Sequence, residues 1–158
     1  MAEENERELT LTRIYDAPRE LVWRFWTDPE LLARWWGPHG VTNPESEVDL
    51  RPGGVIRIVM LAGEEMGPLA GQRWPMQGMF KEIVEPEKLV FANQAVDEAG
   101  NVLIDGMTTV TFEEQDGKTR LTMQTRAKAV TPEAVPMIEG MTAGWTQSLD
   151  KLTEAIKQ

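Results

Sequence analysis

The sequence predicts an α+β fold: a curved seven-stranded antiparallel sheet around one long C-terminal helix, with two short helices after the first strand. From Ser46 to Ala127, short runs of alternating apolar and polar residues are separated by turn motifs. Helical spacing replaces that alternation after Thr131 and continues to Ile156. A single amphipathic helix must bury its apolar stripe, and a curved sheet offers a concave face. We therefore expect the helix to lie inside the curve, with a cavity between helix and sheet.

The N-terminal part predicts a strand followed by two short helices. Glu8–Tyr15 alternates as a strand does. Pro18 suits the first position of a helix, and Asp28 with Pro29 repeats that start signal for a second helix. An apolar stripe runs through both helices until Gly37 ends it.

Turn motifs divide the middle of the chain into six strands. Asp116 and Gly117 form a strong hairpin signal, and Ala62–Arg73, with three glycines and a proline, predicts a long loop. The predicted strands are one that begins at Ser46, then Val55–Leu61, Trp74–Val84, Lys88–Val96, one that ends at Glu114, and Thr119–Ala127.

The chain ends with a predicted long helix. Thr131, Pro132 and Glu133 are typical of a cap, a first helical residue and an acid near the positive end of the helix dipole. Gly140 and Gly144 lie one turn apart inside it, where a glycine costs roughly 1 kcal/mol relative to alanine. We therefore expect a close backbone contact at these glycines. The apolar stripe consists of Ala134, Ile138, Met141, Trp145, Leu149, Leu152 and Ile156.

Length and charge limit the organisation and the partners. The 158 residues suit one domain, assigned to residues 8–158, after a charged, disordered tail at residues 1–7. The net charge of −10 repels phosphate backbones and anionic lipids, so neither nucleic acid nor a membrane is an expected partner. The absence of Cys excludes disulfides, thiolate metal sites and Cys nucleophiles. An acidic N-terminus without an apolar stretch is not a signal peptide, so we expect a cytoplasmic location.

Several motifs together resemble a known family. They include Asp16-Ala17-Pro18, Trp26-Thr27-Asp28-Pro29-Glu30, Trp35-Trp36-Gly37-Pro38, Asp49-Leu50-Arg51-Pro52-Gly53-Gly54, Pro86-Glu87-Lys88-Leu89-Val90-Phe91 and Gly144-Trp145. The chain is similar, over about residues 8–157, to the bacterial AHSA-like homologues of the activator of heat-shock-protein-90 ATPase. These belong to the START-like, birch-pollen-allergen-like SRPBCC superfamily. The resemblance implies the helix-grip fold and a deep cavity but no single function, since the superfamily holds lipid and steroid carriers, hormone receptors, enzymes and drug-sequestering proteins.

Large apolar residues are the candidates for lining the cavity. Six Trp and nine Met in one domain are many, and Met suits adaptable apolar pockets. Pocket lining and plain core filling are weighed about equally for this group. His39, the only histidine, is a candidate at the cavity mouth, against the simpler interpretation of a solvated loop residue. The predicted ligand-binding residues are Trp36, His39, Trp74, Met76, Phe91, Phe112, Met123, Met137, Met141 and Trp145.

These features favour binding of a hydrophobic or aromatic small molecule, with no catalytic residue, cofactor or metal assigned. Two alternatives stay open. One is a cavity enzyme in which His39 or a buried carboxylate acts as general acid or base. The other is a protein-interaction module related to chaperone ATPase activation, with a chaperone partner. A homodimer also stays open. Carboxylate pairs such as Glu64-Glu65 and Asp97-Glu98 fall in loops or turns, where solvated charge is expected.

Overall fold

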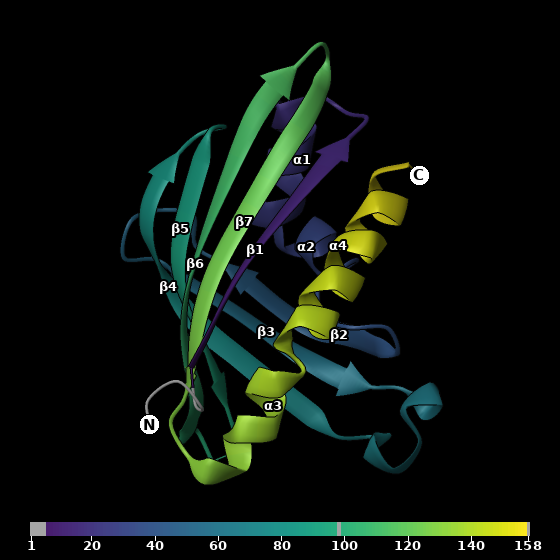
Figure 1. Ribbon diagram of the computed structural model, residues 1–158, viewed down its shortest axis with the longest axis vertical. Coiled ribbons are helices and arrows are strands. Elements are labelled where there is room, and N and C mark those ends of the chain that lie inside the picture. The colour runs from purple at the N-terminus through teal and green to yellow at the C-terminus, as the bar shows by residue number, and fades with distance from the viewer. Residues whose placement is uncertain (1–5, 98, 158) are drawn as a thin grey trace.

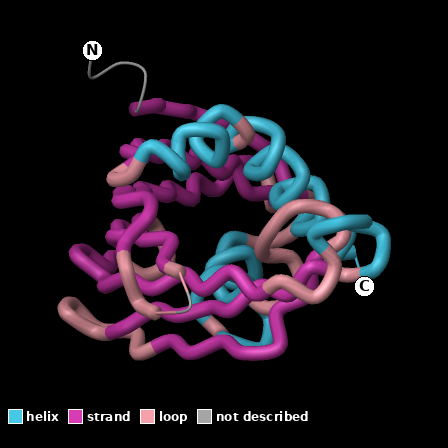
Figure 2. Tube along the Cα trace, turned by 90° about the horizontal axis from the view of Figure 1, so that it is seen from below, coloured by secondary structure: helices cyan, strands magenta, loops and turns pink. Residues whose placement is uncertain are grey.

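The computed structural model describes residues 6–97 and 99–157 of the chain (Figure 1). One seven-stranded sheet has the strand order β1-β7-β6-β5-β4-β3-β2, and every neighbouring pair is antiparallel. Seen from below, the strands curve round and the helices lie along the open side of the curve (Figure 2). The predicted α+β, helix-grip architecture is confirmed. The strands are β1 (Glu6–Tyr15), β2 (Val41–Val48), β3 (Val55–Ala62), β4 (Arg73–Val84), β5 (Lys88–Val96), β6 (Val102–Gln115) and β7 (Lys118–Ala129).

Two short helices follow β1, as the proline and aspartate signals predict. They are α1 (Arg19–Thr27) and α2 (Pro29–Leu32). Asp28 caps α2, its Oδ1 accepting the Glu30 backbone N–H at 2.9 Å. Pro18 is the N-cap of α1 rather than its first residue. Both helices bury their apolar stripe, through Val22, Trp23, Phe25, Trp26 and Leu32.

The C-terminal helix is broken, where the sequence predicts one continuous helix. A 3-10 turn, η3 (Pro132–Ala134), leads into α3 (Val135–Glu139), and α4 (Met141–Lys157) follows. The break is at Gly140, whose ψ of 0° departs from the helical value near −42°. The long C-terminal helix is present as α4, but its predicted unbroken extension back to Pro132 is wrong, because the separate segment α3 precedes it (Figure 1).

Smaller differences concern the ends of elements. β1 begins at Glu6, so the predicted tail at residues 1–7 overlaps the strand, and residues 1–5 lie outside the described part of the chain. The loop predicted over Ala62–Arg73 contains a 3-10 helix, η2 (Glu64–Leu69). The hairpin at Asp116 and Gly117 is confirmed, with φ of 52° and 83°. No helix among the described residues is long and apolar enough to cross a membrane.

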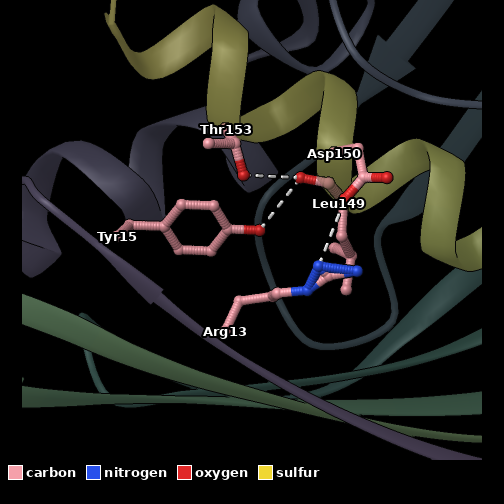
Figure 3. Close-up of polar contacts among 5 residues, drawn as sticks. All are labelled: Arg13, Tyr15, Leu149, Asp150 and Thr153. Carbon is pink, nitrogen blue, oxygen red and sulfur yellow. Dashed lines mark hydrogen bonds and ion pairs between the residues drawn. The ribbon is translucent and has the colours of Figure 1, made fainter.

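Polar contacts fasten α4 to β1 (Figure 3). Tyr15 is 2% exposed, and its hydroxyl donates to the Leu149 carbonyl at 3.3 Å. That carbonyl also accepts from the Thr153 hydroxyl at 3.1 Å. The Arg13 Nη1 lies 3.2 Å from Asp150 Oδ1. These contacts hold the apolar stripe of α4 against the concave face.

The concave face carries two separate apolar clusters. The larger one joins the sheet to α1, the residues around α2 and the C-terminal half of α4. The smaller one joins the sheet to η3 and α3, and consists of Ala127, Ala129, Ala134 and Ile138, with Met141 among the residues packed against it. The candidate site is centred on residues of the central strands that belong to neither cluster.

Candidate functional site

A row of three residues crosses the central strands, and on β4 the larger cluster lies on both sides of it, at Met76 and Phe80. Gly78 on β4 pairs with Asn93 on β5, and Asn93 pairs with Gly106 on β6. None of the three belongs to either cluster. A Cβ at Gly78 would collide with the backbone oxygen of Ala92, and one at Gly106 would lie 2.9 Å from that of Asn93. Glycine is therefore required on both sides, and the central strands present only the Asn93 side chain at this level.

Buried threonines hold the Asn93 amide. Thr108 Oγ1 donates to Asn93 Oδ1 at 2.8 Å and lies 2.8 Å from Thr125 Oγ1. The two threonines are 0% and 1% exposed, whereas Asn93 is only half-buried. Within residues 6–97 and 99–157, Asn93 Nδ2 has no hydrogen-bond partner and is not among the fully enclosed polar atoms. A polar amide thus lies on the concave face with its Nδ2 unpartnered among the described residues.

The first turns of α4 form the opposite side of the site. Met141 packs against the smaller cluster and Trp145, one turn later, against the larger. Gly144 lies on the same stripe as Ser148, which is 4% exposed, yet a Cβ at Gly144 would meet nothing within 4 Å. The expected close contact at the two helix glycines is wrong, because Gly144 faces open space and a Cβ at Gly140 would make only ordinary contacts, at 3.8 Å.

Trp145 forms the wall on the side of the larger cluster. Its ring lies 5.3 Å from that of Trp36, edge to face at 77°, and 6.4 Å from that of Trp26, stacked at 14°. Trp36 and Trp26 are buried, whereas Trp145 is only half-buried. Trp145 is therefore supported by packed aromatic rings without being fully enclosed.

The ten predicted lining residues fall into three groups. Five are at most 5% exposed and belong to the larger cluster: Trp36, Met76, Phe91, Phe112 and Met123. Three are half-buried: Trp74, Met141 and Trp145. Two are exposed: His39 and Met137. The structure places Met141 and Trp145 one turn apart on α4, each against a different cluster, and the binding role of all ten stays a prediction.

The candidates for a general acid or base, His39 and a buried carboxylate, are not found buried at this site. His39 is exposed, and its backbone N–H donates to Gln147 Oε1 at 2.9 Å. No Asp or Glu in the described ranges is buried, and no three His, Asp or Glu side chains there are placed to hold a metal ion. The site residues therefore supply apolar contact and hydrogen bonding.

Lys151 ties α4 to the loop after α2. Its Nζ donates to the carbonyl oxygens of Trp36, Gly37 and Pro38 at 3.4, 3.3 and 3.4 Å. Burial lowers the pKa of Lys151, and the carboxylate of Glu65 acts in the opposite direction. This three-fold contact holds the Trp36 loop against α4 and so supports the aromatic wall.

A hollow of about 560 Å³ lies at the outer surface, away from the gap. Arg19 and Glu87, whose Nη1 and Oε1 are 4.0 Å apart, lie in its wall. Its other lining residues are Val84, Lys88, Thr111, Phe112, Glu113 and Glu114. Five of its eight lining residues are charged, and none of the Gly78–Asn93–Gly106 row is among them.

Sequence reasoning missed Gly78, Asn93 and Gly106. Two signals were available. Glycine inside a strand indicates a close backbone approach, and Asn is depleted in strands. Asn93 falls on the same face as Leu89 and Phe91, both fully buried, where a polar residue needs a partner or a function.

Comparisons with known proteins agree on fold and family. The sequence model of the family described as Activator of Hsp90 ATPase homolog 1-like protein matches residues 16–157. Protein CV1439 from Chromobacterium violaceum is 27% identical, with a TM-score of 0.79 over 96% of this chain and 97% of that one. Protein NE0264 from Nitrosomonas europaea is 28% identical, with a TM-score of 0.74 over 100% of this chain and 97% of that one. No curated protein matches the sequence.

Proposed function

This chain belongs to the family of Activator of Hsp90 ATPase homolog 1-like proteins, and we propose that it binds an apolar small molecule between the Gly78–Asn93–Gly106 row and the first turns of α4. Family and fold suggest either ligand binding or a role related to Hsp90 ATPase activation. The observation that favours ligand binding is the open space at Gly144, on the stretch of α4 between Met141 of the smaller apolar cluster and Trp145 of the larger.

Packing energetics supports this choice. Protein interiors are close-packed, and a gap between apolar walls forfeits the dispersion contacts that a filled core makes. An apolar ligand would restore those contacts and remove its own surface from water, at about 25 cal/mol per Å². Gly78 and Gly106 keep the sheet side open because neither position accepts a Cβ.

Filling the gap from the helix side tests the proposal. N-phenyl-1-naphthylamine is a neutral probe that fluoresces in apolar surroundings. We expect saturable binding to the wild-type protein, with about 2.7 kcal/mol of added stability at a hundredfold excess over Kd. Gly144→Leu should keep the fold, since its Cβ meets nothing, but weaken probe binding at least about tenfold, or 1.4 kcal/mol.

Ala143→Leu is the matched control, because Ala143 is exposed on the same helix. It should bind the probe as the wild type does. Equal probe affinity in wild type and Gly144→Leu would place the probe elsewhere and refute the site. The absence of any saturable binding to the wild type would refute the proposed function.

A second candidate function is a contact with a chaperone through the convex face of the sheet. Met79 and Met107, 44% and 41% exposed, both pair with Ala92 across neighbouring strands. Exposed apolar groups of this kind are used in protein contacts. If this function holds, the chain stimulates Hsp90 ATPase activity, and the double variant Met79→Ser, Met107→Ser loses the stimulation while Gly144→Leu retains it.

A further inference from the structure

We propose that Asn93 determines the specificity of the concave site, and that the ligand is a neutral molecule with a carbonyl oxygen that accepts a hydrogen bond from Asn93 Nδ2. This inference rests on the proposed function, because it names the ligand chemistry of the same site. It follows from how the amide is oriented, from what surrounds it and from where the cations of α4 and β1 are directed.

The threonine hydroxyls orient the amide. Thr108 has one hydroxyl hydrogen, which it donates to Asn93 Oδ1 at 2.8 Å. Thr125 must then be the donor in its own 2.8 Å contact with Thr108. The other acceptor within reach of Thr125, the Met107 carbonyl, is farther away at 3.4 Å. With Oδ1 engaged by this chain, both Nδ2 hydrogens remain for a group outside the protein.

The neighbours of Asn93 leave those hydrogens accessible. Glycines stand opposite it on both sides, at Gly78 and Gly106, so no side chain of an adjacent strand covers the amide. The next inward residue on β5 is Ala95, which is also small and half-buried. A ligand with its apolar body against Trp145 and Met141 would therefore reach a hydrogen-bond donor on the sheet.

The cations of α4 and β1 are engaged elsewhere or exposed, which favours a neutral acceptor over a carboxylate. Lys151 directs its ammonium group to the carbonyl oxygens of the loop after α2, and Arg13 is paired with Asp150. Arg7, at the outer end of the Asn93 row on β1, is exposed. An ionised carboxylate in the gap would lose its hydration without gaining a cation, which is a large cost. A neutral carbonyl group loses less hydration free energy than a carboxylate and gains one hydrogen bond from Asn93.

A set of three probes with the same ring system tests the inference. Naphthalene has no acceptor, 2-acetylnaphthalene carries a neutral carbonyl, and 2-naphthoate carries a charge. For the wild type we expect the ketone to bind about 2- to 12-fold more tightly than naphthalene, the equivalent of one neutral hydrogen bond. We expect 2-naphthoate to bind least tightly.

Asn93→Asp is the diagnostic variant because its carboxylate still accepts from Thr108 but offers no N–H. The preference for ketone over naphthalene should disappear in Asn93→Asp, and also in Asn93→Leu. Because the affinities of naphthalene and 2-acetylnaphthalene are compared within one variant, any change in that variant's stability affects both equally and cancels. Thr109→Ser, which alters a residue on the convex face of β6, is the control and should keep the preference.

The outcomes separate the two proposals. If the preference survives in Asn93→Asp, or if 2-naphthoate binds most tightly, the assignment of Asn93 and of a neutral ligand is overturned while the apolar site stands. If no probe binds the wild type in a manner blocked by Gly144→Leu, the proposed function fails, and this inference with it.

Discussion

Tyr15 shows how one residue couples the fold to pH. Its hydroxyl is buried between β1 and α4, where it donates to the Leu149 carbonyl. Burial raises the pKa of Tyr15 well above its ordinary value near 10, and the Asp150 carboxylate adds to that effect. The Arg13 guanidinium and the Thr153 hydroxyl act in the opposite direction without reversing it. Tyr15 therefore keeps its proton in the folded state when the unfolded chain has lost it.

The sign of the pH effect follows from this difference. Below pH 10 both states hold the proton, and the contribution of Tyr15 to stability is fully present. Above pH 10 the unfolded chain binds fewer protons, so the free energy of unfolding falls by up to about 1.4 kcal/mol per pH unit. Tyr15→Phe should lose about 1 kcal/mol or less at pH 7, because Leu149 still accepts from Thr153.

Urea unfolding of both proteins between pH 8 and pH 11.5 measures the effect. The stability advantage of the wild type should shrink above pH 10. The lowered pKa of Lys151 makes stability rise with pH just below 10.5, but equally in both proteins, so it cancels in the comparison. Parallel pH profiles would show that the phenol is not buried as described.

At the scale of elements, glycines have opposite roles in the sheet and in α4. Gly78 belongs to a strand whose neighbour leaves no room for a Cβ, since the Ala92 carbonyl occupies that place. Gly144 belongs to a helix that faces open space. In the sequence both are glycines inside a regular element. Only the structure shows that a Cβ would collide at Gly78 and would meet nothing at Gly144.

The same substitution should therefore change stability in opposite directions. Gly78→Ala should lower the free energy of unfolding by on the order of 1–3 kcal/mol, because two paired strands must move apart. Gly144→Ala should raise it by about 0.5–1 kcal/mol through helix propensity. Urea denaturation at pH 7 measures the free energy of unfolding of both variants. A loss of stability in Gly144→Ala would mean that the surroundings of Gly144 are packed.

The break in the C-terminal helix marks the limit of what periodicity predicts. The apolar stripe is continuous in sequence from Ala134 to Ile156, and both helical segments use it. Spacing alone cannot show a change of ψ at one glycine. The succession of elements along the chain and the capping of α2 by Asp28 depend on local signals, and there the alternation and turn motifs were sufficient.

At the scale of the whole molecule, the fold could be predicted from the sequence but the candidate site could not. Large apolar residues are candidates for both cavity lining and core, and Phe91, Phe112 and Met123 are among those that the structure buries in the larger cluster. Size explains this, because large side chains close gaps. The candidate site depends instead on residues of little volume, such as Gly78 and Gly106. These flank Asn93 only because of how neighbouring strands are aligned, and the sequence alone does not give that alignment.

The position of a bound apolar molecule is the central claim, and amide NMR tests it most directly. The uniformly ¹⁵N-labelled protein would be titrated with N-phenyl-1-naphthylamine while backbone amide shifts are followed. We predict that the largest shifts occur at Gly78, Asn93, Gly106 and Gly144, on two sides of one gap. Largest shifts at Met79 and Met107 on the convex face, or at Arg19 and Glu87 in the outer hollow, would contradict the account.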